Sequence, residues 1–236
     1  MLLVFPCFLV GQNLNDYGRG IFGNGNRQLR YRILYPMNFD VATKYPLLIF
    51  LHGAFEKGSD NEAQLNIGGR YFLADSNRRN FPALIVFPQC PVDDSWAYFE
   101  TELDSSTGRL KKLNFPFSKE PTEVGLLLKE LLDSLINLSF VDKSKVYVGG
   151  LSQGGMGVYD LIARYPNVFT AAFPICGAGK ISTASKFAPH TAVWIFHAIQ
   201  LLPRRLQIRV PSQCRDPGPS LAHGTHAGRN RRYWLG

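Results

Sequence analysis

Cysteines are few in this chain of 236 residues, and none of the four lies in a C-x-x-C pair or at a metal-ligand spacing. Cys90 and Cys176 end two apolar runs and are expected to be buried free thiols. We expect neither a metal nor an organic cofactor. Internal repeats and low-complexity tracts are also missing, and 45% hydrophobic residues exclude a disordered chain. One large globular domain is therefore predicted.

Long hydrophobic runs are missing as well, so we predict no membrane span. Residues 1–11 are apolar but too short to cross a bilayer. Polar residues follow from Gln12, as they follow the hydrophobic region of a signal peptide, although the usual basic start is absent. The segment thus predicts a signal peptide and a secreted or periplasmic protein. The alternative is a buried N-terminal strand in a cytoplasmic protein.

Acidic residues are scarce at one end of the chain only. The formal net charge is +8, and residues 201–236 hold seven arginines, no lysine and the single acid Asp216. This segment therefore carries +6 of the +8. A basic tail raises the question of nucleic-acid binding. The motifs and interleaved aromatics of a nucleic-acid module are absent, however, so no nucleic-acid partner is expected.

Short apolar runs alternate with helical patterns over most of the chain. The runs that predict strands cover residues 29–35, 46–51, 83–87, 146–148, 170–175 and 191–196. Apolar residues at helical spacing predict one helix over about 121–138 and a second from Gln153 to about Tyr165, where Pro166 ends it. This alternation favours the α/β class, with a mostly parallel sheet and helices on both of its faces.

Residues 150–154, Gly-Leu-Ser-Gln-Gly, directly follow the strand run 146–148 and match the nucleophile elbow, G-x-S-x-G. Flanking glycines leave room for a serine on a tight strand-to-helix turn. Such a turn exposes the Ser152 hydroxyl and aims the first N–H groups of the helix at an anion forming beside it. We predict Ser152 as a nucleophile and the Gln153 N–H as an oxyanion donor. The alternative is a small polar residue in a glycine turn.

A second oxyanion donor is expected in the loop that His52-Gly53 opens after the strand run 46–51. We assign it to the N–H of Ala54. His52 itself is expected to hold this loop by hydrogen bonds rather than to act as a base.

Two long polar segments with scattered aromatic residues, 54–80 and 88–118, predict loops around a site. Within the second segment, Trp96 and Tyr98 are the predicted walls of a substrate pocket. The alternatives are ordinary surface for the segments and packing anchors for the two aromatic residues.

Several longer motifs carry a family resemblance. They are LHGAFEKGSDN (51–61), FPQCP (87–91) with Trp96, GGLSQGG (149–155), PICG (174–177) and VWIFH (193–197). In these motifs, residues 12–197 resemble α/β-hydrolases of the carboxylesterase and predicted-peptidase group, which are relatives of phospholipase/carboxylesterases, feruloyl esterases and the catalytic domain of prolyl oligopeptidases. The resemblance implies an α/β-hydrolase domain over 12–197 with the strand runs beginning near 83, 47, 146, 170 and 191 as successive neighbours. It also implies a Ser-His-Asp triad in which Ser152 attacks an ester or amide carbonyl.

The chain departs from that family pattern after His197. The family places its aspartate in the turn after this strand and its histidine in a later Gly-His loop, whereas the next acid here is Asp216. His223 and His226 are the candidates for the base. Residues 198–236 form an atypical basic tail, and our hypothesis is that a shifted reading frame introduced it, with the C-terminal part of the fold missing. The alternative is a real divergence of the tail from the family. The strand run 191–196 would then form a hydrophobic sheet edge unless the tail covers it.

The sequence as a whole predicts a serine hydrolase of carboxylic esters that forms an acyl-enzyme on Ser152. Its substrate would be a small-molecule ester or a short peptide. A prolyl-oligopeptidase-like serine peptidase is one alternative. A catalytically inactive remnant or binding protein with the same fold is the other, because loss of the acid and the base lowers the rate by several orders of magnitude.

Overall fold

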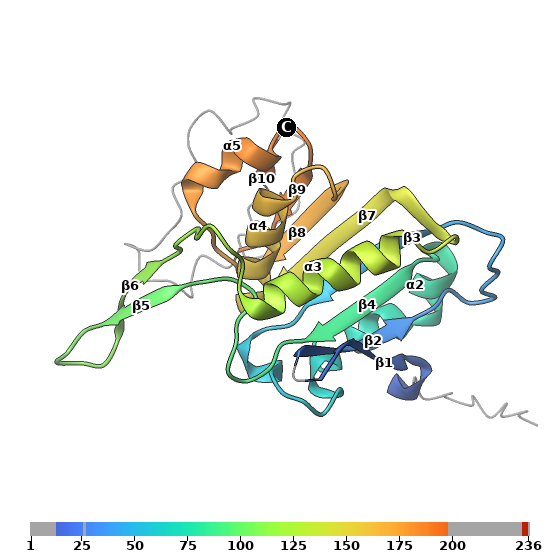
Figure 1. Ribbon diagram of the computed structural model, residues 1–236, viewed down its shortest axis with the longest axis horizontal. Helices are drawn as coiled ribbons and strands as arrows, with labels where there is room; N and C mark the ends of the chain where they lie inside the picture. The colour runs from blue at the N-terminus through green and yellow to red at the C-terminus, as the bar shows by residue number, and fades with distance from the viewer. Residues whose placement is uncertain (1–12, 26, 198–232, 236) are drawn as a thin grey trace, which may run out of the picture.

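A central sheet organises the computed structural model, which describes residues 13–25, 27–197 and 233–235. The strand order among these residues is β1-β2-β4-β3-β7-β8-β9-β10 (Figure 1). The strands are β1 (Gly18–Asn24), β2 (Arg27–Leu34), β3 (Tyr45–Leu51), β4 (Leu84–Gln89), β7 (Val141–Leu151), β8 (Ala171–Ile175), β9 (Ala192–Ile195) and β10 (Tyr233–Leu235).

The central strands β4, β3, β7, β8 and β9 run parallel, and antiparallel pairs lie at the two edges of the sheet. The mostly parallel sheet and the order of its central strands confirm the expectations from the sequence. Every residue of β4 is buried. This is why the run 83–87 is apolar without interruption: both faces of the strand are covered.

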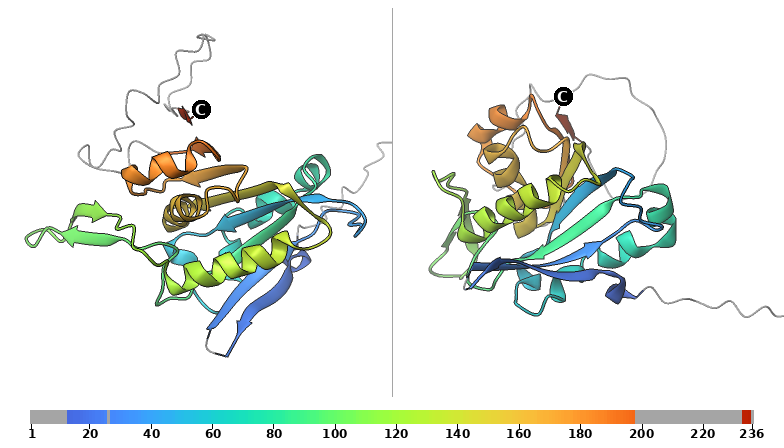
Figure 2. Two further views of the ribbon diagram at one scale, coloured as in Figure 1. Left: turned by 45° about the horizontal axis from the view of Figure 1, so that its top comes forward. Right: turned by 45° about the vertical axis from the view of Figure 1, so that its right-hand side comes forward.

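Side chains of each central strand alternate between two hydrophobic cores, one on each face of the sheet. On β4, Leu84 and Val86 join the core that contains α3 (Glu123–Ile136) and α4 (Gln153–Arg164). Ile85 and Phe87 join the opposite core, to which Leu65 and Leu73 also belong. Figure 2 shows α3 and α4 together over one face of the sheet. Both helices begin and end close to where the sequence places them.

The two segments expected to be loops contain more regular structure than the sequence indicates. The short helices η2 (Ala54–Glu56), η3 (Ala63–Leu65), α1 (Gly69–Leu73) and α2 (Asp75–Asn80) lie in the first segment. The second segment forms a hairpin of β5 (Glu100–Leu103) and β6 (Leu110–Asn114), which projects from the body of the molecule (Figure 2). The remaining short helices are η1 (Leu14–Asp16), η4 (Ile181–Thr183) and α5 (Ala184–Phe187). Elements this short leave no periodic pattern that distinguishes them from loops.

The edge of the sheet at β9 is covered by part of the C-terminal tail. β10 pairs antiparallel with β9, from Tyr233 opposite Ile195 to Leu235 opposite Val193. The strand run 191–196 is expected to form a hydrophobic sheet edge unless the tail covers it, and β10 of the tail does cover it. The predicted signal peptide 1–11 and the rest of the tail lie outside the described residues.

An apolar cavity of about 910 Å³ lies on the face of the sheet that carries α1 and α2. Side chains from adjacent strands line it, among them Leu48 of β3, Tyr147 of β7, Phe173 of β8 and Trp194 of β9. As for membranes, none of the helices within the described ranges is long and apolar enough to cross one.

Candidate active site

Ser152 stands alone between β7, which ends at Leu151, and α4, which begins at Gln153. Its backbone has φ 56° and ψ −113°, a conformation that non-glycine residues rarely adopt and that costs about 1–3 kcal/mol. Such a dihedral pair survives only where the surrounding structure enforces it. The turn thus has the geometry that the G-x-S-x-G pattern predicts.

The neighbouring glycines explain how the strained turn is enforced. A Cβ on Gly154 would lie 2.1 Å from the carbonyl oxygen of Leu51, and a Cβ on Gly150 would lie 2.5 Å from the carbonyl oxygen of Gly154. A Cβ on Gly155 would come within 2.8 Å of the Cα of Gly177, beyond β8. The start of α4 is therefore pressed against the ends of both β3 and β8, where no side chain fits.

Two backbone hydrogen bonds hold Ser152 in this position. Its N–H donates to the carbonyl of Ile175 at 2.8 Å, and its carbonyl accepts from the N–H of Met156 at 3.1 Å. The side-chain hydroxyl makes no capping hydrogen bond to α4. The hydroxyl is therefore not committed to helix capping, which is the usual role of a serine at this position.

The loop after β3 lies directly beside the elbow. Leu51 pairs with Gly150 in the parallel register, so the two chains leave the sheet side by side. A Cβ on Gly53 would lie 3.7 Å from the Cβ of Ser152. Ala54 comes next and opens η2, while Gln153 is the first residue of α4. The structure thus brings Ala54, Ser152 and Gln153 to the end of the sheet at which the parallel strands β3 and β7 finish. Their catalytic roles stay predictions.

His52 lies at the base of this loop and is fully buried. Its Nδ1–H donates to the carbonyl of Gly53 at 2.7 Å, and its Nε2 accepts from the N–H of Cys90 at 2.9 Å. Trp96 packs edge-to-face against the imidazole and donates its indole N–H to the His52 carbonyl. Burial lowers the pKa of His52 to about 4. The ring is therefore neutral at pH 7 and holds the loop, as expected from the sequence.

Trp96 does not line an open pocket, which corrects the expectation from the sequence. Its side chain is almost fully buried, and a Cβ on Gly157 of α4 would lie 2.5 Å from the Trp96 Cβ. The Trp96 side chain fills the space between Gly157 of α4 and His52, since its hydrogen bond and its ring contact are both made with His52. It is a packing anchor, the alternative that the sequence left open.

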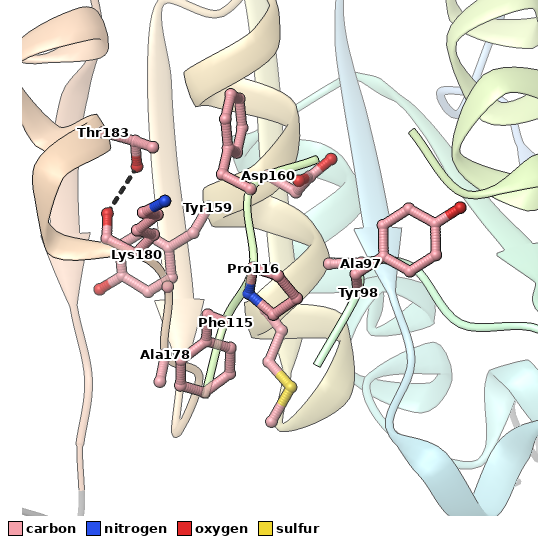
Figure 3. Close-up of a pocket in the computed structure, with 12 residues that line it drawn as sticks. Ala97, Tyr98, Phe115, Pro116, Tyr159, Asp160, Ala178, Lys180 and Thr183 are labelled. Carbon is pink, nitrogen blue, oxygen red and sulfur yellow. Dashed lines mark hydrogen bonds between the residues drawn. The ribbon is translucent and has the colours of Figure 1, made fainter. Parts of the chain in front are cut away.

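Tyr98, in contrast, lines a small cavity of about 20 Å³ beside α4. Figure 3 shows its ring on one side, Phe115 and Pro116 in the middle, and Ala178 opposite. Met156, one turn of α4 beyond Ser152, completes the lining near the elbow. The predicted role of Tyr98 as a pocket wall is compatible with this position.

The predicted bases, His223 and His226, lie outside the described residues, as does Asp216. Among the histidines that the structure describes, His197 follows β9, just as Ser152 follows the parallel strand β7. Its Nδ1 is buried and has no hydrogen-bond partner within the described ranges. Its strand lies two positions from that of Ser152, or about 10 Å at the usual strand spacing.

Sequence reasoning missed two buried polar residues, one in the loop after β3 and one at the end of β4. Glu56 is buried on η2, and a Cβ on Gly53 would lie 3.1 Å from its Oε2. Gln89 ends β4 and is also buried. Both belong to the motifs 51–61 and 87–91, so the motifs were the available signal. Over the described part of the chain, no group of three His, Cys, Asp or Glu side chains could hold a metal ion.

Comparisons with known proteins agree with this geometry. The family model described as esterase matches residues 24–198. A thermostable esterase of known structure is 30% identical, with a TM-score of 0.65, over 78% of this chain and 47% of that one. This chain therefore spans about half the length of that esterase. No curated protein sequence matches significantly.

Two further solved structures align less closely. Est1E from Butyrivibrio proteoclasticus is 18% identical, with a TM-score of 0.46, over 70% of this chain and 53% of that one. A ferulic acid esterase is 18% identical, with a TM-score of 0.49, over 72% of this chain and 63% of that one.

Proposed function

The chain belongs to the esterase family of α/β-hydrolases, and on this premise we propose that it hydrolyses carboxylic esters through an acyl-enzyme on Ser152. The observation that carries the proposal is the strained backbone of Ser152 between β7 and α4. A serine that neither caps its helix nor relaxes its backbone is positioned for chemistry rather than for stability.

The proposed reaction has two halves. In the first, the Ser152 Oγ attacks the ester carbonyl carbon, its proton passes to a base, and the alcohol leaves with a proton. In the second, water attacks the acyl-enzyme, the carboxylic acid leaves and Ser152 regains its proton. His223 and His226 remain the proposed candidates for the base.

The N–H groups of Gln153 and Ala54 would stabilise the negative charge that forms on the carbonyl oxygen in both halves. Gln153 opens the twelve-residue helix α4, whose dipole adds to the stabilisation of an anion at this end. Ala54, which opens η2 after the neighbouring strand β3, would supply the second donor. As the substrate class we propose small-molecule carboxylic esters.

A fluorophosphonate probe tests the proposal, because it modifies a serine only when the serine is nucleophilic and an oxyanion hole is formed. We expect the recombinant chain to be labelled at Ser152, as located by peptide mass spectrometry, and Ser152→Ala to remain unlabelled. Circular dichroism and thermal unfolding of both chains control for folding. A folded wild-type chain that is not labelled would contradict the proposal and favour an inactive binding protein.

Substrate comparison separates the ester hydrolase from a prolyl-directed peptidase. Turnover of p-nitrophenyl acetate should exceed turnover of a prolyl p-nitroanilide, measured at equal concentrations of labelled sites. The opposite ranking would favour the peptidase.

A further inference from the structure

The loop at residues 52–61, which carries the proposed donor Ala54, is not held in place by the residues at its tip. Ala54 is exposed, and Phe55 is 98% exposed, so neither side chain packs against the body of the protein. Irregular backbone of this kind keeps one position only if its polar groups find fixed partners. Partners of this loop lie on β2, through Arg32, and in the segment after β4, through Trp96, but the side chain with the most hydrogen bonds to it is Gln89 at the end of β4.

Gln89, the last residue of β4, contacts the loop at three points. Its side chain is 2% exposed. The Oε1 atom accepts from the N–H of Asn61 at 2.8 Å, and the Nε2 atom donates to Oδ1 of Asp60 at 2.6 Å and to the carbonyl of Glu56 at 3.4 Å. A carboxamide suits this position because it combines an acceptor and two donors on one uncharged group.

Cys90, the next residue, contacts the same loop through its backbone. Its carbonyl accepts from the N–H of Gly58 at 3.0 Å, and its N–H donates to Nε2 of His52 at 2.9 Å. A Cβ on Gly58 would lie 3.1 Å from Nε2 of Gln89, so a glycine permits this close approach. The end of β4 therefore fixes both the beginning and the end of the loop.

The position of the loop matters for catalysis because Gly53 contacts the elbow and Ala54 follows it. An oxyanion donor is effective only at about 2.7–3.1 Å from the developing charge, so a small displacement of the loop removes its effect. We propose that Gln89 is a positioning residue for the oxyanion hole: its carboxamide holds the loop 52–61, and with it the Ala54 N–H, against Ser152. This inference rests on the proposed function of Ser152.

Two variants of Gln89 and one control test the inference. Gln89→Met keeps the length of the side chain but removes its hydrogen bonds. Gln89→Glu keeps the acceptor for Asn61 but sets a carboxylate against Asp60. Thr122→Ala is the control, because Thr122 is equally buried and its hydroxyl caps α3 through the Gly125 N–H, away from the loop.

The kinetic measurements are the rate of fluorophosphonate labelling and the kcat and KM for p-nitrophenyl acetate, expressed per labelled site. For Gln89→Met we expect kcat and the labelling rate to fall about tenfold or more, because loss of one donor costs about 10²–10³ in kcat. KM should change by less than about threefold, since the hole acts on the transition state. Thr122→Ala should keep wild-type values.

For Gln89→Glu, the ratio of its kcat to that of the wild type should rise as the pH falls. Protonation gives the introduced carboxyl group a donor for Asp60 and removes the repulsion between two carboxylates. A loss that is purely structural would show no such recovery. Wild-type kcat in Gln89→Met, or a loss equal to that of Thr122→Ala, would overturn the inference.

Hydrogen exchange separates this inference from the proposed function. The amides of Gly58 and Asn61 should exchange faster in Gln89→Met than in the wild type, and at the wild-type rate in Thr122→Ala. If the wild-type chain is not labelled by the probe, the proposed function fails, and the exchange rates alone decide whether Gln89 holds the loop. Unchanged exchange in Gln89→Met refutes the inference in either case.

Discussion

The neutral imidazole of His52 should make the stability of the folded chain fall steeply between pH 7 and pH 4. The ring is fully buried against Trp96, with Nδ1 donating to Gly53 and Nε2 accepting from Cys90. A proton on Nε2 would remove the acceptor for the Cys90 N–H and place a charge where no water reaches it. The folded protein therefore resists protonation at His52.

The size of the effect follows from the two pKa values of His52. Burial lowers its pKa from 6.5 to about 4 in the folded chain. Because the folded pKa is the lower one, the unfolded chain binds the proton first as the pH falls. The stability that depends on neutral His52 is complete above pH 6.5 and is lost as the pH falls toward 4. At about 1.4 kcal/mol per pH unit, the loss amounts to about 3 kcal/mol.

Urea unfolding at several pH values between 7 and 4 measures this loss, with His52→Gln as the comparison. The glutamine offers an acceptor for the Cys90 N–H but does not titrate, and all other ionisable groups are shared. The free energy of unfolding of the wild type should fall by about 3 kcal/mol more than that of His52→Gln over this range. Parallel pH profiles for the two chains would refute the reasoning.

Two further predictions concern the packing around the elbow. Gly154→Ala should lower the free energy of unfolding by about 3 kcal/mol or more in urea, because its Cβ would lie 2.1 Å from the Leu51 carbonyl. Gly25→Ala, whose Cβ meets nothing within 4 Å, should cost only about 1–2 kcal/mol of left-handed strain, and equal losses would contradict this. Burial raises the pKa of Cys90 to about 12, so iodoacetamide at pH 8 should modify the half-buried Cys176 and spare Cys90. Equal labelling in peptide maps would be the contrary result.

The sheet could be predicted from the sequence where its strands are buried on both faces. The residues of β4 and β3 are apolar almost without a break, and a sequence pattern of this kind has few other structural interpretations. β1 could not be predicted, because Gly18, Gly20 and Gly23 interrupt it and it lies at the edge of the sheet. The hairpin of β5 and β6 could not be predicted for a related reason: β5 is exposed along its whole length and shows no apolar face.

The elbow could be predicted because its motif consists of consecutive residues. The contacts between Gln89 and the loop 52–61 could not. The contacts of Gln89 join residues about thirty positions apart. The motif 87–91 contains Gln89, but a motif does not show whether the side chain is buried or which loop it contacts. The same limit applies to Trp96, since an aromatic residue in a predicted loop can point inward or outward with equal ease.

Three adjacent strands together position the proposed nucleophile and the proposed oxyanion donor Ala54. β7 supplies the strained Ser152, β3 supplies the loop with Ala54, and β4 holds that loop through Gln89. Neighbouring strands of one hydrogen-bonded sheet cannot shift independently, so the core fixes the strand ends from which the elbow and the loop 52–61 begin. The proposed base, His223 or His226, follows β9 in the sequence. Substitutions in the tail should therefore change proton transfer while the nucleophile and the oxyanion hole keep their geometry.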